Sequence, residues 1–240
     1  MIARTAAVVE PGGVLGELSC APPLTLRQVH GDVPGRLELR LVGTAAGPLA
    51  GDDLSLSLRL RPGARATLRA AAASLAQGNN QGASTLSVRA DLGDGSDLFA
   101  DPGPLVVCHG SRVDVRLGVT LGRDATLEWR ETIVLGRTGE PAGEATLRWD
   151  VTRLGRPVLR QFVDLADRAW TAWPGLTAGR RVLACGLIAD PSATPRTIVA
   201  SQTAVAQRLA DRSLLVTVLG NDAAAANQEL EELATSARAH

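Results

Sequence analysis

Few side chains in this sequence could bind a metal or act as a catalyst, and they are scattered. The three histidines are His30, His109 and the terminal His240. Cys108 and His109 are adjacent, and neighbouring residues on a strand point to opposite faces, so this pair is poorly placed to share one ion. We therefore expect a packed thiol beside a histidine at the rim, and no permanently bound cofactor.

The cysteines do not indicate a disulfide framework either. Cys20, Cys108 and Cys185 are odd in number and far apart, and no C-x-x-C pair occurs. This usage is typical of free thiols that are buried in a protein of a reducing compartment.

Paired carboxylates, which glycoside hydrolases use as acid and base, occur in two places. Asp52 precedes Asp53, and Glu140 is followed by Glu144. Such enzymes need two or three acids on one face beside a cleft, whereas adjacent residues diverge. The sequence also lacks a G-x-S-x-G elbow, a phosphate-binding loop, a dinucleotide fingerprint and an H-E-x-x-H motif. We therefore predict a protein that is not an enzyme.

The composition argues against several classes of partner. The formal net charge is zero, so nothing draws the chain to nucleic acid or to an anionic membrane. Aromatic residues make up 2%, too few for sugar-stacking or base-stacking platforms. The opening MIARTAAVVEPGG has too short an apolar stretch for a signal peptide, and no segment approaches the roughly 18 apolar residues of a membrane helix. We expect a cytoplasmic protein.

The candidate side chains must be positioned by short strands. Residues 51–78 read GDDLSLSLRLRPGARATLRAAAASLAQG, in which leucines alternate with serines and arginines before a Pro-Gly turn. The same period of two recurs at 86–92, 113–121 and 145–151. This period is typical of strands with one buried face, and Gly-rich or Asp-rich turns separate the runs. We expect the alternating leucines to form core and the serines between them to face away from it. The leucines are Leu54, Leu56, Leu58 and Leu60.

We predict an all-β fold, a β-helix-like stack of strands, within one domain over 1–240. The β body is expected over about 1–190 and a strand-and-helix part over about 191–240, because period-two alternation dominates before residue 190 and helix formers follow it.

Two C-terminal helices are expected. One is predicted near 200–211, where Val205 and Leu209 stand at i, i+4 and Ser201 could cap the first turn. The other is predicted near 222–237, with Asn221 or Asp222 as its cap.

Three stretches, taken in order, add a family resemblance. The first is PPLTLRQV (22–29) with GTAAGPLAGDDLSLSLRLRPGARATLRAAAAS (43–74), the second is DPGPLVVCHGSRVDVRLGVTL (101–121), and the third is ATLEWRETIVLGRTGEPAGEATLRWDVTRLGRPVLRQFVDL (125–165). Together they resemble the urease accessory protein UreD family, called UreH in some lineages, across roughly residues 22–165. The helical end resembles it loosely.

The resemblance implies a mostly β fold with two helices and a noncatalytic function. It implies a scaffold in nickel loading that binds apo-urease and a second accessory protein, UreF, and through UreF is linked to the GTPase UreG. It also implies an internal passage for nickel in transit, lined partly by acidic residues. Scattered carboxylates suit such a cargo, because oxygen ligands release the ion more readily than a Cys/His cluster does.

Carried over residue by residue, the resemblance assigns motif positions. Asp52 matches the Asp of the family's Gly-Gly-Asp turn, with Asp53 beside it, and Glu131 matches the Glu six residues before the Arg of Leu-Gly-Arg. The remaining candidate site residues come from that tripeptide and from the Gly-Glu that follows it. The sequence GRTGEPAGE contains two such Gly-Glu pairs, so the glutamate can be either of two residues. These candidates are Leu135, Gly136, Arg137, and either Glu140 or Glu144.

Arg137 is the motif residue with the clearest local chemistry. Gly136 allows a tight bend before it, and either Glu140 or Glu144 is close enough in sequence to accept a bidentate bond from its guanidinium. Such a pair could fix the turn or face a partner. The chain departs from the family after the Pro-Gly-Ala strand, where RAAAASLAQG replaces a more polar Thr-Thr-Gln-rich segment.

Two functional hypotheses from other classes of protein remain open at this point. One is a carbohydrate-active β-solenoid enzyme, which the low aromatic content and the absence of an acid cluster disfavour. The other is a general β-rich interaction module without a role in metal transfer.

Overall fold

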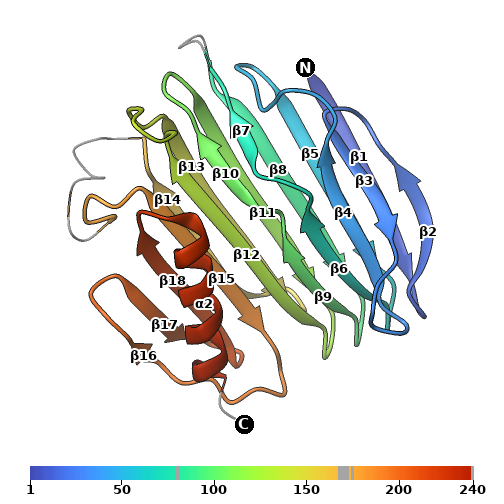
Figure 1. Cartoon of the computed structure of the whole chain (residues 1–240). Coiled ribbons are helices and arrows are strands. Elements are labelled where there is room, and N and C mark those ends of the chain that lie inside the picture. The colour runs from blue at the N-terminus through green and yellow to red at the C-terminus, as the bar shows by residue number, and fades with distance from the viewer. Residues whose placement is uncertain (79–81, 167–172, 174–175, 239–240) are drawn as a thin grey trace.

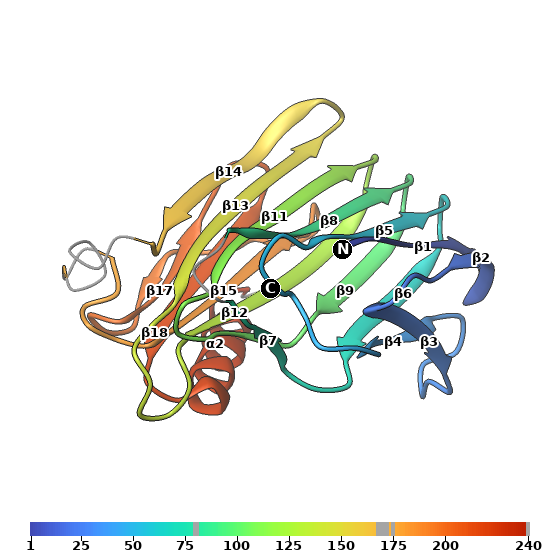
Figure 2. The ribbon, with the colours of Figure 1, turned by 90° about the horizontal axis from the view of Figure 1, so that it is seen from above.

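A computed structural model describes residues 1–78, 82–166, 173 and 176–238. Two β-sheets lie face to face, and one long helix covers part of the outer surface of the larger sheet (Figures 1 and 2). The seven-stranded sheet has the order β14-β13-β11-β8-β5-β1-β2. Its strands in chain order are β1 (Ile2–Glu10), β2 (Val14–Ser19), β5 (Asp53–Leu60), β8 (Ser84–Leu92), β11 (Arg112–Leu121), β13 (Glu144–Arg153) and β14 (Arg156–Asp164).

The eleven-stranded sheet has the main order β16-β17-β18-β15-β12-β9-β6-β4-β3, with β7 and β10 beside it. Its first strands are β3 (Leu24–Val29), β4 (Leu37–Gly43), β6 (Arg65–Ala70), β7 (Ser74–Ala76), β9 (Asp97–Asp101) and β10 (Pro104–Val107). The later ones are β12 (Thr126–Leu135), β15 (Val182–Ala189), β16 (Ile198–Val199), β17 (Ala204–Arg208) and β18 (Ser213–Gly220).

Between β5 and β13 the chain winds from one sheet to the other and back, so that successive coils stack in parallel. Asp53 pairs with Thr85, and Asp114 pairs in turn with Thr85 and with Thr146. On the opposite sheet Arg65, Asp97 and Thr126 are aligned in the same way. The β-helix-like stack predicted from the sequence is confirmed.

The core between the sheets consists of the inward residues of both. Leu54, Leu56, Leu58 and Leu60 are all buried, whereas Ser57 between them is exposed. Alanines such as Ala66 and Ala100 face the same core, and short side chains allow a close approach of the sheets. The alternation therefore predicted the faces of β5 correctly.

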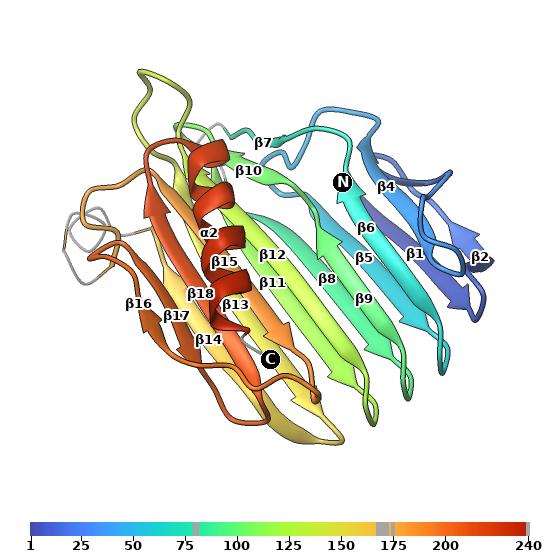
Figure 3. The same ribbon diagram turned by 60° about the horizontal axis from the view of Figure 1, so that its bottom comes forward.

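Helix α2 (Ala223–Ala237) confirms the second predicted helix. The Asp222 Oδ1 atom accepts a hydrogen bond from the Ala225 N–H at 2.8 Å and so caps the first turn. The helix lies over β15 and β18 (Figure 3), and its residues Ala226, Leu230 and Leu233 are buried in one cluster with residues of β15, β17 and β18. Because β15 lies under the helix on one face and the core on the other, every residue in it is buried.

The predicted helix over 200–211 is wrong. Residues 204–208 form β17, which pairs antiparallel with β18. The buried residues are Ala204 and Ala206, a period of two, and β18 offers a ladder of backbone hydrogen bonds that local helix propensity does not outweigh. Ser201 caps no helix and accepts instead from the Thr203 N–H. Within the described residues α2 is the only helix.

The faces of β5 can be tested with one substitution on each. We expect Leu56→Asp to lower the stability by several kcal/mol, because a carboxylate facing the core must lose its charge or open the sheets. Ser57→Asp, one position away on the exposed face, should melt within a few degrees of the unsubstituted protein. Equal melting temperatures for the two variants, measured by circular dichroism, would contradict the assignment.

Candidate functional site

The motif residues from Leu135 to Glu144 lie at the end of β12 and in the connection to β13. We call residues 136–143 the Arg137 loop. Gly136 has a φ of +79° and Gly139 a φ of +75°, a region that favours glycine. A Cβ atom on Gly136 would lie 2.7 Å from Nη2 of Arg181 and equally close to the carbonyl oxygen of Pro141. Gly136 is therefore required both by its backbone conformation and by the lack of space.

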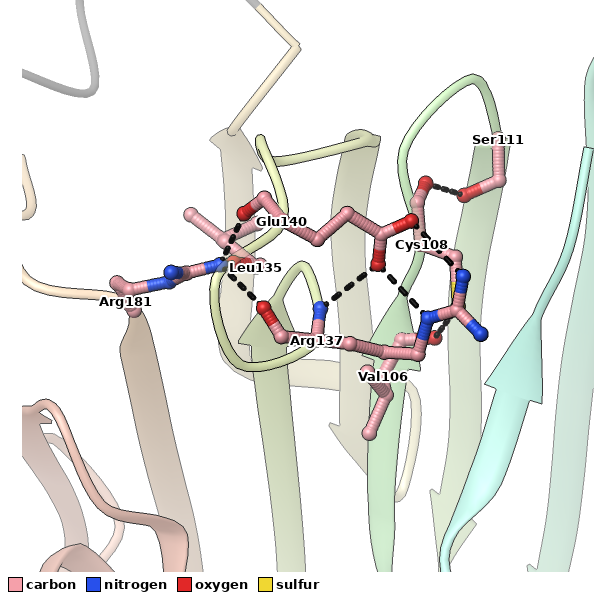
Figure 4. A network of polar contacts seen from close by, with 7 residues as sticks. All are labelled: Val106, Cys108, Ser111, Leu135, Arg137, Glu140 and Arg181. Atoms are coloured by element: carbon pink, nitrogen blue, oxygen red, sulfur yellow. Dashed lines mark hydrogen bonds and ion pairs between the residues drawn. The ribbon is translucent and has the colours of Figure 1, made fainter.

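Arg137 and Glu140 form the bidentate pair that the sequence offered as one of two choices (Figure 4). The Arg137 Nε atom donates to Glu140 Oε2 at 2.9 Å, and Nη2 donates to Oε1 at 3.1 Å. The backbone N–H of Arg137 donates to the same carboxylate at 3.0 Å. The Arg137 guanidinium, together with this backbone bond, lowers the pKa of Glu140 to about 2.

Glu144 takes no part in that pair. It begins β13, its side chain is 49% exposed, and its carboxylate is 3.7 Å from the Arg112 Nε atom. The Glu144 N–H donates to the carbonyl of Ser111 instead. Of the two possible acceptors for Arg137, the structure selects Glu140.

Arg181 holds the Arg137 loop from the far side, and sequence reasoning missed it. Its guanidinium donates to the carbonyl oxygen of Leu135 through Nε at 3.1 Å and Nη2 at 2.9 Å. Nη2 also donates to the carbonyls of Arg137 and Glu140 (Figure 4). Arg181 precedes β15, far away in the chain, and no local pattern marks it. Only the pairing of β12 with β15 brings it to this loop.

The loop rests on the turn that follows β10. The N–H groups of Gly136 and Gly143 both donate to the carbonyl of Val107, at 2.8 and 3.1 Å. Cys108 is buried beneath the loop, and burial raises the pKa of its thiol. The packed thiol expected at Cys108 is confirmed. Cys185 is buried as well, but Cys20 is exposed, so the expectation of three buried thiols is wrong for Cys20.

Glu131 lies in the interior, apart from the loop. It faces the core from β12 with Trp129, whose indole Nε1 donates to Glu131 Oε2 at 3.3 Å. Burial raises the pKa of Glu131 to about 7, and the nearby Asp101 charge acts in the same direction. Cys185 pairs with Glu131 across β12 and β15, and burial raises the pKa of its thiol to about 12.

A break in the eleven-stranded sheet lies level with Glu131. Ala100 of β9 pairs with Trp129, and Pro104 of β10 pairs with Thr132. Three residues, 101–103, therefore face two on β12, and the neighbouring coil has a similar break at 71–73, between β6 and β7. The ladder beside the buried carboxyl group is interrupted on that side.

Asp52 and Asp53 diverge, as their adjacency predicted. The Asp52 carboxylate is buried and accepts from the Met1 ammonium at 2.7 Å and from the Leu49 N–H at 2.9 Å. Asp53 faces outward from β5 and pairs with Arg4 on β1. The two carboxylates do not face one cleft.

A pocket of about 310 Å³ opens between the sheets near Asp52. Gly47 and Pro48 line it beside the Asp52 turn, Leu54 and Leu86 come from the seven-stranded sheet, and residues 70–75 form another wall. This wall includes the break at 71–73, and a Cβ atom added at Gly103 in the second break would touch Ala70. The pocket therefore reaches the interrupted part of the larger sheet.

The four acids proposed for a nickel passage are not brought together. Asp52, Glu131, Glu140 and Glu144 have separate environments, and within the described ranges no group of three or more His, Cys, Asp and Glu side chains is close enough to hold a metal ion. This arrangement differs from a closed metal centre, which gathers its ligands around one ion.

The stacked parallel coils, which form two facing sheets, define a β-helix-like protein. The residues that the structure describes contain no group of side chains placed to hold a metal ion. A family model described as UreD urease accessory protein matches residues 5–240. The chain belongs to this family.

Named relatives agree with the family model. The chain is 37% identical over 261 residues to the urease accessory protein UreD of Parafrankia sp. (strain EAN1pec), an alignment that covers 97% of this chain and 87% of the relative. It is 40% identical over 148 residues to a UreD of Streptomyces griseus, with 62% and 58% covered. A second UreD of that organism is 35% identical over 229 residues, with 92% and 89% covered. In the part of the chain that the structure describes, no helix has the length and apolar character to cross a membrane.

The Arg137–Glu140 pair predicts a measurable role in stability. We expect Arg137→Ala and Arg137→Lys both to lower the melting temperature, by up to about 3 °C, because Lys lacks the planar fork and the pair is exposed to solvent. Arg112→Ala is the matched control, since Arg112 approaches Glu144 only at 3.7 Å. An Arg137→Lys variant that melts like the unsubstituted protein would show that the pair does not fix the loop.

Glu131 predicts a pH dependence of stability. In the unfolded chain this carboxyl group has its ordinary pKa of 4.5, whereas the folded protein retains the proton until about pH 7. The stability should therefore fall as the pH rises from 4.5 to 7, by on the order of 3 kcal/mol from this group. Glu131→Gln should remove this component, and Glu144→Gln should not. Urea denaturation at about pH 5 and pH 8 measures it, and parallel losses in the Glu131→Gln and unsubstituted proteins would refute it.

Proposed function

We propose that this chain is a noncatalytic scaffold in the nickel-dependent maturation of urease. It binds apo-urease and a UreF-like accessory protein, and through the latter it is linked to a UreG-like GTPase. The observation that carries the proposal is the match of the UreD family model over residues 5–240, together with relatives named urease accessory protein. The absence of a gathered set of ligands in the described residues is compatible with it.

Nickel is cargo in this proposal, and the interior between the sheets is the part of the molecule through which it moves. The support is the pocket beside Asp52, its wall at 71–73, and the position of Glu131 beside the next break in the same sheet. One carboxyl group facing the core gives weak oxygen coordination, which suits an ion that must leave again.

Among the four candidate acids, Glu131 is the one we assign to direct contact with nickel. Asp52 is held by the Met1 ammonium and by a backbone N–H, and Glu140 is held by Arg137. Glu144 lies at the surface. Among the described residues, Glu131 accepts a hydrogen bond only from Trp129, at 3.3 Å, and it faces the interior. Asp52 lies beside the pocket and Glu140 belongs to the Arg137 loop.

The protonated thiol of Cys185 is more compatible with a passage for nickel than with a site that stores it. Burial raises the pKa of this thiol to about 12, so its ionisation is costly. The thiolate is the form that binds metal tightly, and a thiol that is costly to ionise favours weaker binding of nickel beside Glu131.

Activation of urease in a host that carries the urease structural genes and the other accessory genes tests this function. Without this chain, the purified urease should contain little nickel and show little activity. With it, both should be restored, and the isolated chain should show no turnover of its own. Full nickel loading in its absence would overturn the proposal.

Glu131→Gln tests the passage within that assay. We expect on the order of tenfold lower nickel incorporation, with the variant still folded and still retained by apo-urease. Glu144→Gln is the control and should load nickel normally. Unchanged nickel incorporation in the Glu131→Gln variant would remove Glu131 from the passage and leave the scaffold function standing.

A further inference from the structure

The outer face of the seven-stranded sheet is not covered by any described element of the chain. Helix α2 lies on the other side of the molecule, against the eleven-stranded sheet (Figures 2 and 3). Parallel sheets usually have both faces covered. Here the outer face carries serines, threonines, arginines and aspartates from β1, β5, β8, β11 and β13.

Parallel register arranges these side chains in rows that run across the strands. One row contains three arginines and two serines, in the order Arg4, Ser55, Ser87, Arg116 and Arg148, so that Arg116 and Arg148 are direct neighbours. The next row contains Ser57, Arg89, Gly118 and Asp150. Because adjacent strands are about 4.8 Å apart, side chains in a row lie next to one another.

The two rows surround a depression of about 610 Å³. Gly118 lies in it, and a Cβ atom on that residue would meet nothing closer than the Arg89 Cγ atom at 4.0 Å. The short side chains of Ser55 and Ser57 leave space on one side, while Arg116 and Arg148 border the other. We call this surface the arginine face; its arginines are Arg4, Arg89, Arg116 and Arg148.

The guanidinium groups of the arginine face are incompletely paired. Arg89 makes no hydrogen bond or ion pair with a described residue. Arg148 stacks on the half-exposed ring of Phe162 at 5.0 Å, and Arg116 reaches Asp114 only at 3.4 Å. Arg4 alone is closely paired, with Asp53 at 2.5 Å. Three positive charges around this depression are thus available to a partner.

We infer that the arginine face docks a carboxylate-rich surface of a protein partner. Guanidinium groups bind carboxylates in a planar, bidentate geometry, and arginines and aromatic rings such as Phe162 are enriched in protein interfaces. The acidic side chains of Asp53 and Asp114 border the arginine row. Such mixed charge fits a protein surface better than a uniformly negative nucleic acid.

This inference rests on the proposed function, since the partner belongs to the urease maturation machinery. The test uses the full chain with arginines reversed on the arginine face, Arg89→Glu, Arg116→Glu and Arg148→Glu together. The control reverses three exposed arginines at strand ends and turns outside it, Arg61→Glu, Arg123→Glu and Arg156→Glu. The overall change in charge is the same in both variants.

Binding to purified apo-urease and to a purified UreF-like protein is measured at low and high salt. We expect the arginine-face variant to lose at least about tenfold in affinity for one of the two, mainly in the association rate, and the control to lose little. The loss should shrink as salt screens the charges. If the charge-reversed protein does not fold, Arg89→Gln, Arg116→Gln and Arg148→Gln replace it, with the same expected direction.

Three outcomes overturn the inference while the proposed function stands. The first is unchanged binding of both partners by the arginine-face variant, and the second is an equal loss in the control. The third concerns duplex DNA as a further probe in the same assay: the variant loses DNA binding while its protein binding is intact. Failure of the unsubstituted chain to bind either partner is a different result, because it overturns the proposed function and this inference with it.

Discussion

In-register parallel pairing between successive coils is the constraint on which the rest of this structure depends. Because Asp53, Thr85 and Asp114 are aligned, each later residue of β5, β8 and β11 shares a face with its neighbours. A shift of one residue in any coil would send its apolar side chains to solvent and its polar ones into the core. The leucine-rich core and the arginine face are therefore two consequences of one register.

The interior acquires its acidic group where that register is interrupted. β12 runs unbroken, while the adjacent coil divides into β9 and β10 and the coil beyond it into β6 and β7. Glu131 lies on the unbroken strand level with the first of these breaks, and its buried carboxyl group, with a pKa of about 7, retains its proton to near neutral pH. Local irregularity in the sheet and a polar interior position thus occur together.

Rigidity and exposure coincide in the Arg137 loop. Arg181 fixes the backbone through carbonyl groups from one side, and the turn after β10 supports it from the other. Arg137 is tied to Glu140, yet its side chain is 60% exposed. A residue that stabilises the loop therefore also presents a fixed guanidinium at the surface, so a structural role and a partner contact are compatible at this position.

Local patterns in the sequence determined the alternating strands within 51–78, 86–92, 113–121 and 145–151, the faces of β5, the helix over 222–237 and the restriction of Arg137 to two nearby acids. These features depend on residues a few positions apart. Tertiary structure decided what distant segments contribute. β18 turned the predicted helix over 200–211 into a strand, since backbone pairing with a neighbouring strand outweighs helix propensity. Arg181 reached the Arg137 loop through the pairing of β12 with β15. The environment of Glu131 and the rows of the arginine face likewise exist only when coils stack, because each is built from strands that are separated in the sequence and adjacent in space.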